Sequence, residues 1–463
     1  MPPKPNLLDI QSGILKHHGR NHVRCFFIRF TSHNDESIKS WISGKIAPLV
    51  TNAKKQLDDT ANYRSGQYAT SGTAIFSFFL SRSGYEKLFP REQDKRHWPK
   101  DPSFRKGMKA QSVRERLNDP PLEQWEPRFR ENADAMILVA DDHLPVIESY
   151  AQTIIQLLGE EDIGTLLFEE NGKAFRLHGQ TVEHFGYADG ISDLECIVGE
   201  TVTQNGLDHV LIEEGDGRYG SYLVFRKLEQ NVKVFFDEIK RVTEALGIEG
   251  HEEFIGAQAI GRFRNGMPLT LSKDPYSRDV SFGRTEMPSD AGAIRCPFHA
   301  HARVAKDAGD DGILIARRGI TYDEIGRDED FAKKPREGVG LLFMSFQKGI
   351  YGQFEKLQRY LNSDRYPERA DPIAGQPAER ASQNWNVEWV GHREWGNGQR
   401  VPTIFASQFS KVVTLKGGDY FYAPSLTFLR TLDGKPRPAP PPPNTGYRRN
   451  SSYWYQRFRQ YKP

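Results

Sequence analysis

The sequence is poor in cysteine, in long apolar runs and in net charge. Only three cysteines, Cys25, Cys196 and Cys296, occur among 463 residues, and no two of them form a C-x-x-C pair. Few, widely spaced cysteines indicate a reducing compartment rather than a disulfide framework. The first ten residues, MPPKPNLLDI, contain neither an apolar signal core nor twin arginines. Together these features predict a cytoplasmic protein.

Two further absences limit the partners. No apolar run reaches the roughly 18 residues that a membrane-spanning helix needs, so we expect no membrane partner. Lysine and arginine total 63 against 61 aspartates and glutamates, and the net charge of +2 argues against nucleic-acid binding. With 37% apolar residues, the chain has enough core for two globular domains.

Two similar successions of strands and helices divide the chain. β-rich apolar segments predict strands at residues 23–30, 73–80, 135–140, 221–226 and 341–346. Apolar residues at helical spacing predict helices at residues 38–49, 147–158 and 232–246. The Phe-Glu-Lys-Leu sequence at Phe354 repeats the Tyr-Glu-Lys-Leu at Tyr85, each shortly after a strand. This order predicts an α+β fold with two ferredoxin-like modules, residues 1–215 and 216–463.

Other stretches lie outside this repeat. Residues 95–130 are charged and poorly periodic, and residues 363–400 are rich in Pro, Gly, Arg and Trp, so both predict irregular excursions. Residues 435–444, KPRPAPPPPN, predict a stiff polyproline II spacer. The tail after residue 446 mixes cations with aromatics, as a single-strand nucleic-acid platform does. We favour a strap that packs on the body or on a neighbouring subunit, which leaves a homo-oligomer open.

The most specific chemistry lies in residues 295–319, RCPFHAHARVAKDAGDDGILIARRG. In a helix beginning at His299, the side chains of His299 and His301 point about 200° apart, so only one faces a given pocket. On a strand at residues 312–317, Arg317 and Arg318 likewise face opposite sides, and one looks inward. An inward imidazole and an inward guanidinium could serve the two faces of a haem. The alternative is that these are ordinary core or surface residues.

A second stretch, residues 186–193 (GYADGISD), is a glycine-flanked loop that presents the carboxylate of Asp189. A plain Asp-Gly turn is the alternative explanation for this pattern.

Both stretches resemble motifs of the dye-decolorising peroxidases. Residues 186–190 are similar to the GxxDG motif of that family, and residues 295–303 are similar to its RCPFxAHxR motif. Similar segments follow in the family's order at 10–20, 107–108, 220–226, 261–269, 315–320, 340–347 and 417–425. The resemblance covers nearly the whole chain. It implies two ferredoxin-like modules of the dimeric α+β barrel type, with antiparallel sheets and haem in the C-terminal module.

The resemblance also implies a role for each site residue. His301 matches the family's proximal histidine and is the expected iron ligand, whereas His299 is expected to point away. Asp189 is the expected base that takes a proton from peroxide. Arg317 is the expected fixed positive charge for the developing anion. Leu341 and Phe343, alternate residues of one strand, are expected to line the distal side.

Two assignments concern how the haem is held. A proximal histidine usually donates a hydrogen bond from its second nitrogen, and Asp419 in the GGDYF sequence is the candidate acceptor. The family's sequence after the proximal histidine continues toward Asn-Pro-Arg, whose arginine meets a haem propionate. Here the sequence is ARVAKDAGDDG, which keeps Arg303 but lacks that later arginine. Arg303 or Lys306 is the expected substitute.

The leading prediction is a haem b peroxidase with one non-covalent haem per chain, since no C-x-x-C-H motif is present. Its expected substrates are hydrogen peroxide and bulky phenolic or dye-like aromatic donors. A protein that binds haem and releases its iron is an alternative, and so is a non-enzymatic ferredoxin-like assembly module. Because bulky donors cannot enter the pocket, electrons are expected to leave through surface aromatics: Trp385, Trp389, Trp395, Tyr420 and Tyr422.

Overall fold

The computed structural model describes residues 5–67, 72–160, 162–177, 179–188, 194, 196–198, 201–276, 289–310, 312–327, 330–362, 371, 373, 385–393, 395–396 and 403–435. Asp189, most of the proline-rich segment and the basic aromatic tail lie outside these residues. No helix within the described part of the chain is long and apolar enough to cross a membrane.

The N-terminal module is built on an antiparallel sheet, and the three strands that the sequence predicts in it are confirmed. The strands are β1 (His22–Phe30), β2 (Ile75–Ser81), β3 (Ala135–Asp141) and β4 (Gly164–Lys173). Their order across the sheet is β4-β1-β3-β2, the order of a ferredoxin-like module. Helix α7 (Leu144–Gly159) packs across β1, β3 and β4 through its predicted apolar face.

The C-terminal module repeats this order. Its strands in the main sheet are β10 (Arg218–Gln230), β11 (Ala316–Arg317), β12 (Ile320–Asp323), β13 (Val339–Gln347) and β16 (Val413–Ala423). They lie in the order β16-β10-β13, with β11 and β12 both paired to the outer edge of β13. The strand expected at residues 312–317 is therefore only two residues long, and β12 continues the edge after a two-residue break.

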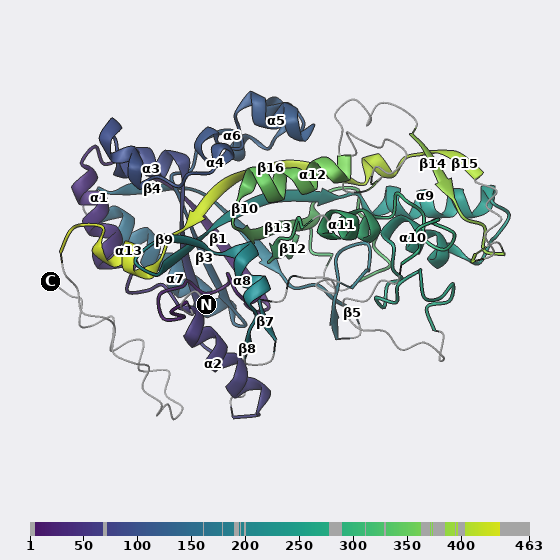
Figure 1. The fold of residues 1–463 in the computed structure, drawn as a ribbon, viewed down its shortest axis with the longest axis horizontal. Coiled ribbons are helices and arrows are strands. Elements are labelled where there is room, and N and C mark those ends of the chain that lie inside the picture. The colour runs from purple at the N-terminus through teal and green to yellow at the C-terminus, as the bar shows by residue number, and fades with distance from the viewer. Residues whose placement is uncertain are drawn as a thin grey trace.

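The two modules share one continuous sheet. β16 pairs with β2 at Phe421–Ser81 and Tyr422–Leu80, and with the short β9 (Ile212–Gly215) the sheet has ten strands. The far ends also meet, because β12 packs against β4. There the Thr321 hydroxyl donates to the Lys173 carbonyl at 2.5 Å. The α+β fold with antiparallel sheets is confirmed, and its strands curl toward a barrel (Figure 1).

One face of the C-terminal sheet is covered by helices. The π-helix η4 (Ile350–Phe354) contacts β10 and β13, and α12 (Glu355–Asn362) continues it. α11 (His301–Asp310) packs against α12, whereas α9 (Val232–Ala245) and α10 (Glu252–Ile260) pack together at the right of Figure 1. The Phe354 ring lies 6.1 Å from that of Phe343 and 6.3 Å from that of Tyr420. Phe343 and Tyr420 therefore point from β13 and β16 toward the helices.

Residues 92–130 differ from the irregular excursion that the sequence predicts. They form a run of short helices: η2 (Glu92–His97), α4 (Pro102–Lys106), α5 (Gln111–Leu117), η3 (Leu122–Gln124) and α6 (Pro127–Arg130). None exceeds seven residues, so no apolar periodicity is visible. A start signal was present at α4, where the Asp101 carboxylate accepts from two backbone N–H groups and Pro102 follows.

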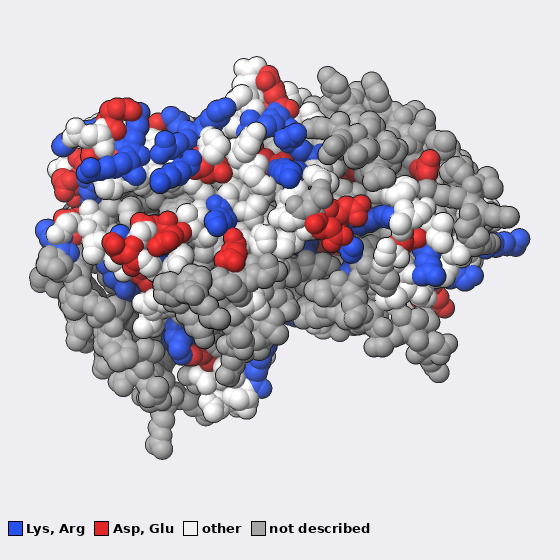
Figure 2. Space-filling view, in the orientation of Figure 1, with Lys and Arg blue, Asp and Glu red and all other residues white. Residues whose placement is uncertain are grey.

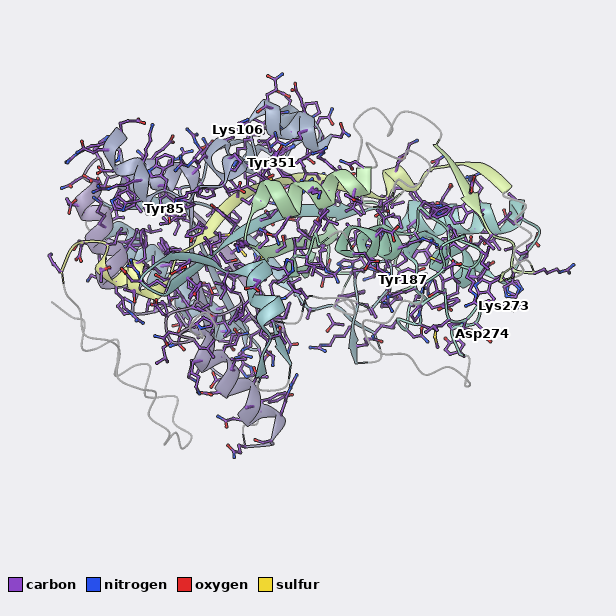
Figure 3. All side chains as sticks on the ribbon, viewed as in Figure 1. Tyr85, Lys106, Tyr187, Lys273, Asp274 and Tyr351 are labelled. Atoms are coloured by element: carbon purple, nitrogen blue, oxygen red, sulfur yellow. The ribbon has the colours of Figure 1, made fainter. Side chains whose placement is uncertain are left out.

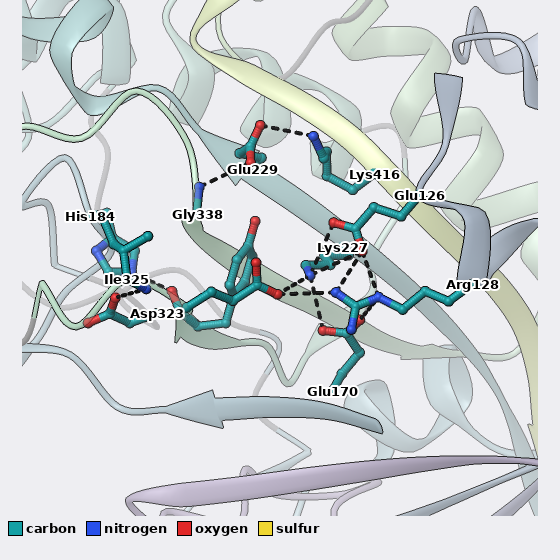
Figure 4. Close-up of polar contacts among 12 residues, drawn as sticks. Glu126, Arg128, Glu170, His184, Lys227, Glu229, Asp323, Ile325, Gly338 and Lys416 are labelled. Atoms are coloured by element: carbon teal, nitrogen blue, oxygen red, sulfur yellow. Dashed lines mark hydrogen bonds and ion pairs between the residues drawn. The ribbon is translucent and has the colours of Figure 1, made fainter. Parts of the chain in front are cut away.

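A buried ion cluster joins the two modules (Figure 4). The side chain of Lys227 on β10 is completely buried, and its Nζ lies 2.6 Å from Glu324, 3.2 Å from Glu126 and 3.3 Å from Glu170. Glu170 comes from β4, whereas Glu324 follows β12. Burial raises the pKa of Glu170 to about 7, against the opposing charges of Lys227 and Arg128.

This pKa predicts how stability depends on pH. Folding raises the pKa of Glu170 from 4.5 to about 7, so the folded state binds this proton more tightly than the unfolded state does. The resulting contribution to the free energy of unfolding is complete below pH 4.5 and is lost as pH rises through 7. Glu170→Gln should remove this decline, which amounts to about 3 kcal/mol of unfolding free energy. Denaturant unfolding at a series of pH values measures it. The control is Glu169→Gln on the more exposed face of β4, and equal pH slopes for the wild type and Glu170→Gln would contradict the assignment.

Candidate active site

His301 is the first residue of α11, and its ring is fixed by a buried carboxylate. The Nδ1–H group donates to Oδ2 of Asp371 at 2.5 Å, and the Asp371 side chain is fully buried. Asp371 is itself held, because its Oδ1 accepts from the Ile373 backbone N–H at 2.8 Å. This bond selects the tautomer whose Nε2 carries a lone pair. Nε2 makes no hydrogen bond to any described residue, and a third of the side chain is exposed.

Asp371 replaces Asp419, which was the wrong candidate for this position. The Asp419 carboxylate pairs with Lys109 and accepts from the Tyr420 backbone N–H, so it serves a different part of the sheet. Sequence reasoning missed Asp371 because 70 residues separate it from His301 in a stretch without periodicity.

His299 lies in the apolar core, as expected for the histidine that points away. It is 3% exposed, and its ring meets that of Trp389 edge-on with centroids 5.3 Å apart. Helical spacing does not separate the two rings, because α11 begins at His301 and His299 lies before it. The turn that precedes α11 separates them.

The Arg303 guanidinium is engaged by the turn before α11, so it is not free for the propionate role that the sequence suggested. It donates to the carbonyls of Cys296 and Asp290, both at 2.6 Å, and lies over the Phe298 ring. These contacts fix the turn that precedes α11. Lys306 forms an ion pair with Asp310 one turn along the helix. The motif identified the residue types but could not show which groups each charged side chain contacts.

Arg317 and Arg318 face opposite sides of the β11 edge, as predicted. Arg318 is buried and donates to the backbone carbonyls of Gly13 at 2.9 Å and Ile14 at 3.1 Å. Arg317 lies opposite Ser345 on β13, so its side chain shares a sheet face with Ser345 and Phe343. Arg317 is therefore the arginine on the helix-covered face.

Arg262 adds a second cation that sequence reasoning missed. It is 6% exposed and donates to the Gly266 carbonyl at 3.0 Å. Burial lowers its pKa, and the positive charge of Arg317 lowers it further, so the two charges are near enough to repel each other. A pair of neighbouring cations favours an anionic ligand. Only its place in the GRFRNG segment could have drawn attention to Arg262.

Leu341 and Phe343 lie on the same sheet face as Arg317. The intervening Leu342 and Met344 are completely buried on the other face, whereas Leu341 and Phe343 stay partly exposed. The helices thus leave part of this apolar surface uncovered beside Arg317.

The loop before Asp189 is held by Glu183. Its carboxylate accepts from the backbone N–H groups of Phe185 at 2.8 Å and Tyr187 at 2.9 Å. The Ala188 N–H donates to the Arg264 carbonyl at 3.1 Å. The chain is therefore fixed up to the residue preceding Asp189, which itself lies outside the described residues.

These residues fit a haem. His301 offers an imidazole with an open Nε2 and an anchored Nδ1, and α11 packs against α12, which continues the helix η4 that contacts Phe343. Among the described residues, no group of three or more His, Cys, Asp or Glu side chains could hold a metal ion. A single imidazole suits an iron whose other ligands come from a porphyrin.

Comparison with known proteins decides the family. The family model described as the DyP dimeric alpha+beta barrel domain matches residues 9–169, and the one described as Dyp-type peroxidase, C-terminal, matches residues 184–376. The multifunctional dye peroxidase DyP2 of an Amycolatopsis species is 31% identical, over 92% of this chain and 95% of that protein. The chain belongs to the DyP-type peroxidase family.

Solved structures agree with this assignment. The crystal structure of a DyP-type peroxidase from an Anabaena species superposes with a TM-score of 0.79 at 34% identity, covering 92% of this chain and 94% of that one. The structure of the Amycolatopsis DyP2 also gives 0.79, at 29% identity, with coverage of 92% and 96%. This DyP-type peroxidase is thus a haem-dependent enzyme, not a non-enzymatic assembly module.

The histidine geometry predicts which residue retains haem. His301→Ala should lose tightly bound haem, because the open Nε2 belongs to His301, whereas His299→Ala should keep it. Asp371→Asn should retain haem but weaken its affinity about 10- to 100-fold, as other changes beside metal-binding histidines do. Soret absorbance during titration of the apoprotein measures this. Loss of haem from His299→Ala but not from His301→Ala would reverse the assignment.

Substitution of Arg317 should affect the rate of the peroxide step, whereas substitution of Arg318 should affect the stability of the fold. Arg317→Ala should slow the peroxide-consuming step by about 10²- to 10³-fold, because a fixed charge beside the reacting oxygen is lost. Arg318→Ala should leave that step nearly unchanged but lower the unfolding free energy by about 3 kcal/mol, since buried carbonyls lose a charged donor. Stopped-flow traces and denaturant unfolding measure the two effects. Equal slowing by both variants would contradict the opposite facing of the two side chains.

Proposed function

We propose that this chain binds one non-covalent haem b and uses hydrogen peroxide to oxidise bulky phenolic or dye-like donors. The observation that carries the proposal is the His301–Asp371 pair on α11, which packs against α12, the helix that continues η4 beside Phe343. The name of the Amycolatopsis relative, a multifunctional dye peroxidase, supports the donor class. We place the protein in the cytoplasm, which its three buried free thiols suit, and homo-oligomerisation stays a prediction.

His301 would hold the haem through Nε2. Asp371 accepts the Nδ1–H bond, which orients the ring and makes the imidazole more electron-rich. When bound, haem supplies the iron centre at which the peroxide O–O bond breaks. With Arg303 committed to Asp290 and Cys296, Arg262 is the candidate to face a propionate, which leaves Arg317 for the peroxide.

On the opposite side, Asp189 would accept the proton from the near oxygen of peroxide and return it to the far one. Arg317 would stabilise the charge that develops on the oxygens. Leu341 and Phe343 would line this side and exclude water, and a large donor would not fit beside them. Donors of that size must therefore be oxidised from the surface.

The predicted set of surface aromatics needs correction. Trp389, Tyr420 and Tyr422 are all buried, so none of them can touch a donor. The side chain of Trp385 lies outside the described residues, and Trp395 is half-buried beneath the Arg295 guanidinium. Among the residues that the structure describes, the exposed aromatic nearest in sequence to the site is Tyr351, on η4.

One experiment tests the function directly. Spectra of the purified holoenzyme before and after one equivalent of peroxide, followed by a phenolic donor, should show a Soret change and its reversal. A haem-binding protein that releases its iron would instead lose the Soret band without oxidising the donor.

Asp189→Asn tests the proton transfer. If Asp189 is the base, the rate of the peroxide step should fall as pH drops through its titration and stay flat at higher pH. The asparagine variant should be slower by about 10²- to 10⁴-fold and should lack the acid limb. Asp193→Asn, the next carboxylate in the loop, is the matched control. Retention of the wild-type rate and acid limb by Asp189→Asn would move the base elsewhere.

A further inference from the structure

Arg327, in the segment after β12, is a completely buried cation. On the face drawn in Figure 2, by contrast, lysines and arginines stand at the surface among carboxylates. The Arg327 guanidinium lies 5.2 Å from the ring centroids of both Phe175 and Phe331. Its Nη2 is buried and makes no hydrogen bond to any described residue. A cation enclosed in this way acts strongly on any anion nearby, because little solvent screens it.

Arg327 holds the loop that precedes Asp189. Its Nη1 donates to the His184 carbonyl oxygen at 2.8 Å and lies 3.2 Å from His184 Nδ1. His184 Nε2 lies 2.9 Å from the Tyr322 carbonyl, which can only accept, so Nε2 carries the proton and Nδ1 accepts from Arg327. Burial lowers the pKa of His184 to about 4, so the ring is neutral above that pH. One guanidinium nitrogen therefore contacts both the backbone and the ring of His184.

The turn that carries Arg327 is itself anchored. The Asp323 carboxylate accepts from the backbone N–H groups of Ile325 at 3.2 Å and Arg327 at 3.0 Å. Glu324, between Asp323 and Ile325, is the carboxylate 2.6 Å from Lys227 in the buried ion cluster (Figure 4). Arg327 therefore reaches the loop from a fixed base.

The far side of the loop packs on two helices. The Phe185 ring stacks on that of Phe235 on α9, with centroids 4.1 Å apart, and Tyr187 meets the same ring edge-on. Tyr187 lies in the C-terminal module (Figure 3), and a Cβ at Gly256 on α10 would clash with its hydroxyl. These rings fix the loop from the side opposite Arg327.

The near side of the loop lies against the segment of Arg327. Gly186 has a φ of +94°, and a Cβ there would lie 3.0 Å from the Phe331 ring. Val182 pairs with Ala188, so the closed hairpin ends one residue before the expected base.

The other charged groups around the loop are Glu183, Asp323, Asp330 and Arg264. The three carboxylates accept from backbone N–H groups of their own segments. Arg264 lies 5.1 Å from the Phe236 ring centroid. Tyr187 is neutral, because burial raises its pKa. Among the described residues, no carboxylate therefore forms an ion pair with Arg327.

We propose that Arg327 is a positioning residue for the peroxide step, which holds the loop that presents Asp189 and whose enclosed charge favours the ionised carboxylate. Only the anion of Asp189 can accept a proton, and a nearby cation stabilises that form. The hold acts through the His184 carbonyl, so Arg327 affects both the place and the charge of the expected base. The inference rests on the proposed function, in which Asp189 takes the proton from peroxide.

Two variants separate the hold from the charge, in stopped-flow measurements on the holoenzyme at a series of pH values. Arg327→Gln should slow the peroxide step about tenfold at neutral pH and move its acid limb up by about one pH unit, because the loop loosens and the cation is lost. Arg327→Lys keeps the charge but lacks the planar fork, so it should slow the step by about threefold and leave the acid limb in place. Amide hydrogen exchange gives a readout without turnover, and residues 184–188 should exchange about tenfold faster in Arg327→Gln.

Arg20→Gln is the matched control, because Arg20 is also a buried arginine that donates to main-chain carbonyls, those of His18 and Thr73, in the N-terminal module. It should lower stability without moving the acid limb or the exchange of residues 184–188. A wild-type acid limb in Arg327→Gln, or an equal movement in Arg20→Gln, would overturn the inference. If Arg327→Gln does not fold, Arg327→Lys decides alone, since a wild-type rate or a moved acid limb in that variant would also overturn it.

Asp189→Asn separates this failure from failure of the proposed function. If Asp189→Asn loses the acid limb while the Arg327 variants behave as the wild type, only the role of Arg327 is refuted. A holoenzyme that consumes no peroxide with any donor would instead refute the peroxidase assignment.

Discussion

The enclosed charge of Lys227 sets the strongest constraint on this structure. A fully buried ammonium is tolerated only when carboxylates surround it, and these come from β4, from the segment before α6 and from the turn after β12. The cluster therefore requires both modules to be in place. Its neighbour Arg226 points to the other face of β10, where it pairs with buried Asp119. Ion pairs thus fix both faces of the strand at the centre of the C-terminal module.

The sequence predicts the framework well where apolar residues are continuous. β1 and β3 begin and end within one or two residues of their predicted limits, because runs such as VRCFFIRF have one favourable environment, the interior of a sheet. The short helices between residues 92 and 130 escaped prediction because none is long enough to show a repeating apolar face. Facing on regular strands was also predictable, as the separation of Arg317 from Arg318 illustrates.

The contacts of individual charges were not predictable. A motif identifies Arg303 and Asp419 by type, but the turn before α11 takes up the first and Lys109 the second. Asp371 was not predicted at all, because no pattern in its own segment indicates that it contacts a histidine 70 residues away. Such pairings depend on the closure of long loops, which only the assembled fold determines.

The hydrogen bonds from Arg318 to the carbonyls of Gly13 and Ile14 connect the beginning of the chain to the strand that bears Arg317. The same N-terminal segment is held at its other side by Gln11, whose side-chain amide donates to the carbonyls of Phe78 and Pro424. The N-terminal segment is thus a structural part of the active-site edge rather than a free extension. For protein engineering, trimming into residues 11–14 would remove the carbonyls that accept from Arg318, and the cost would be the stability of the β11 edge.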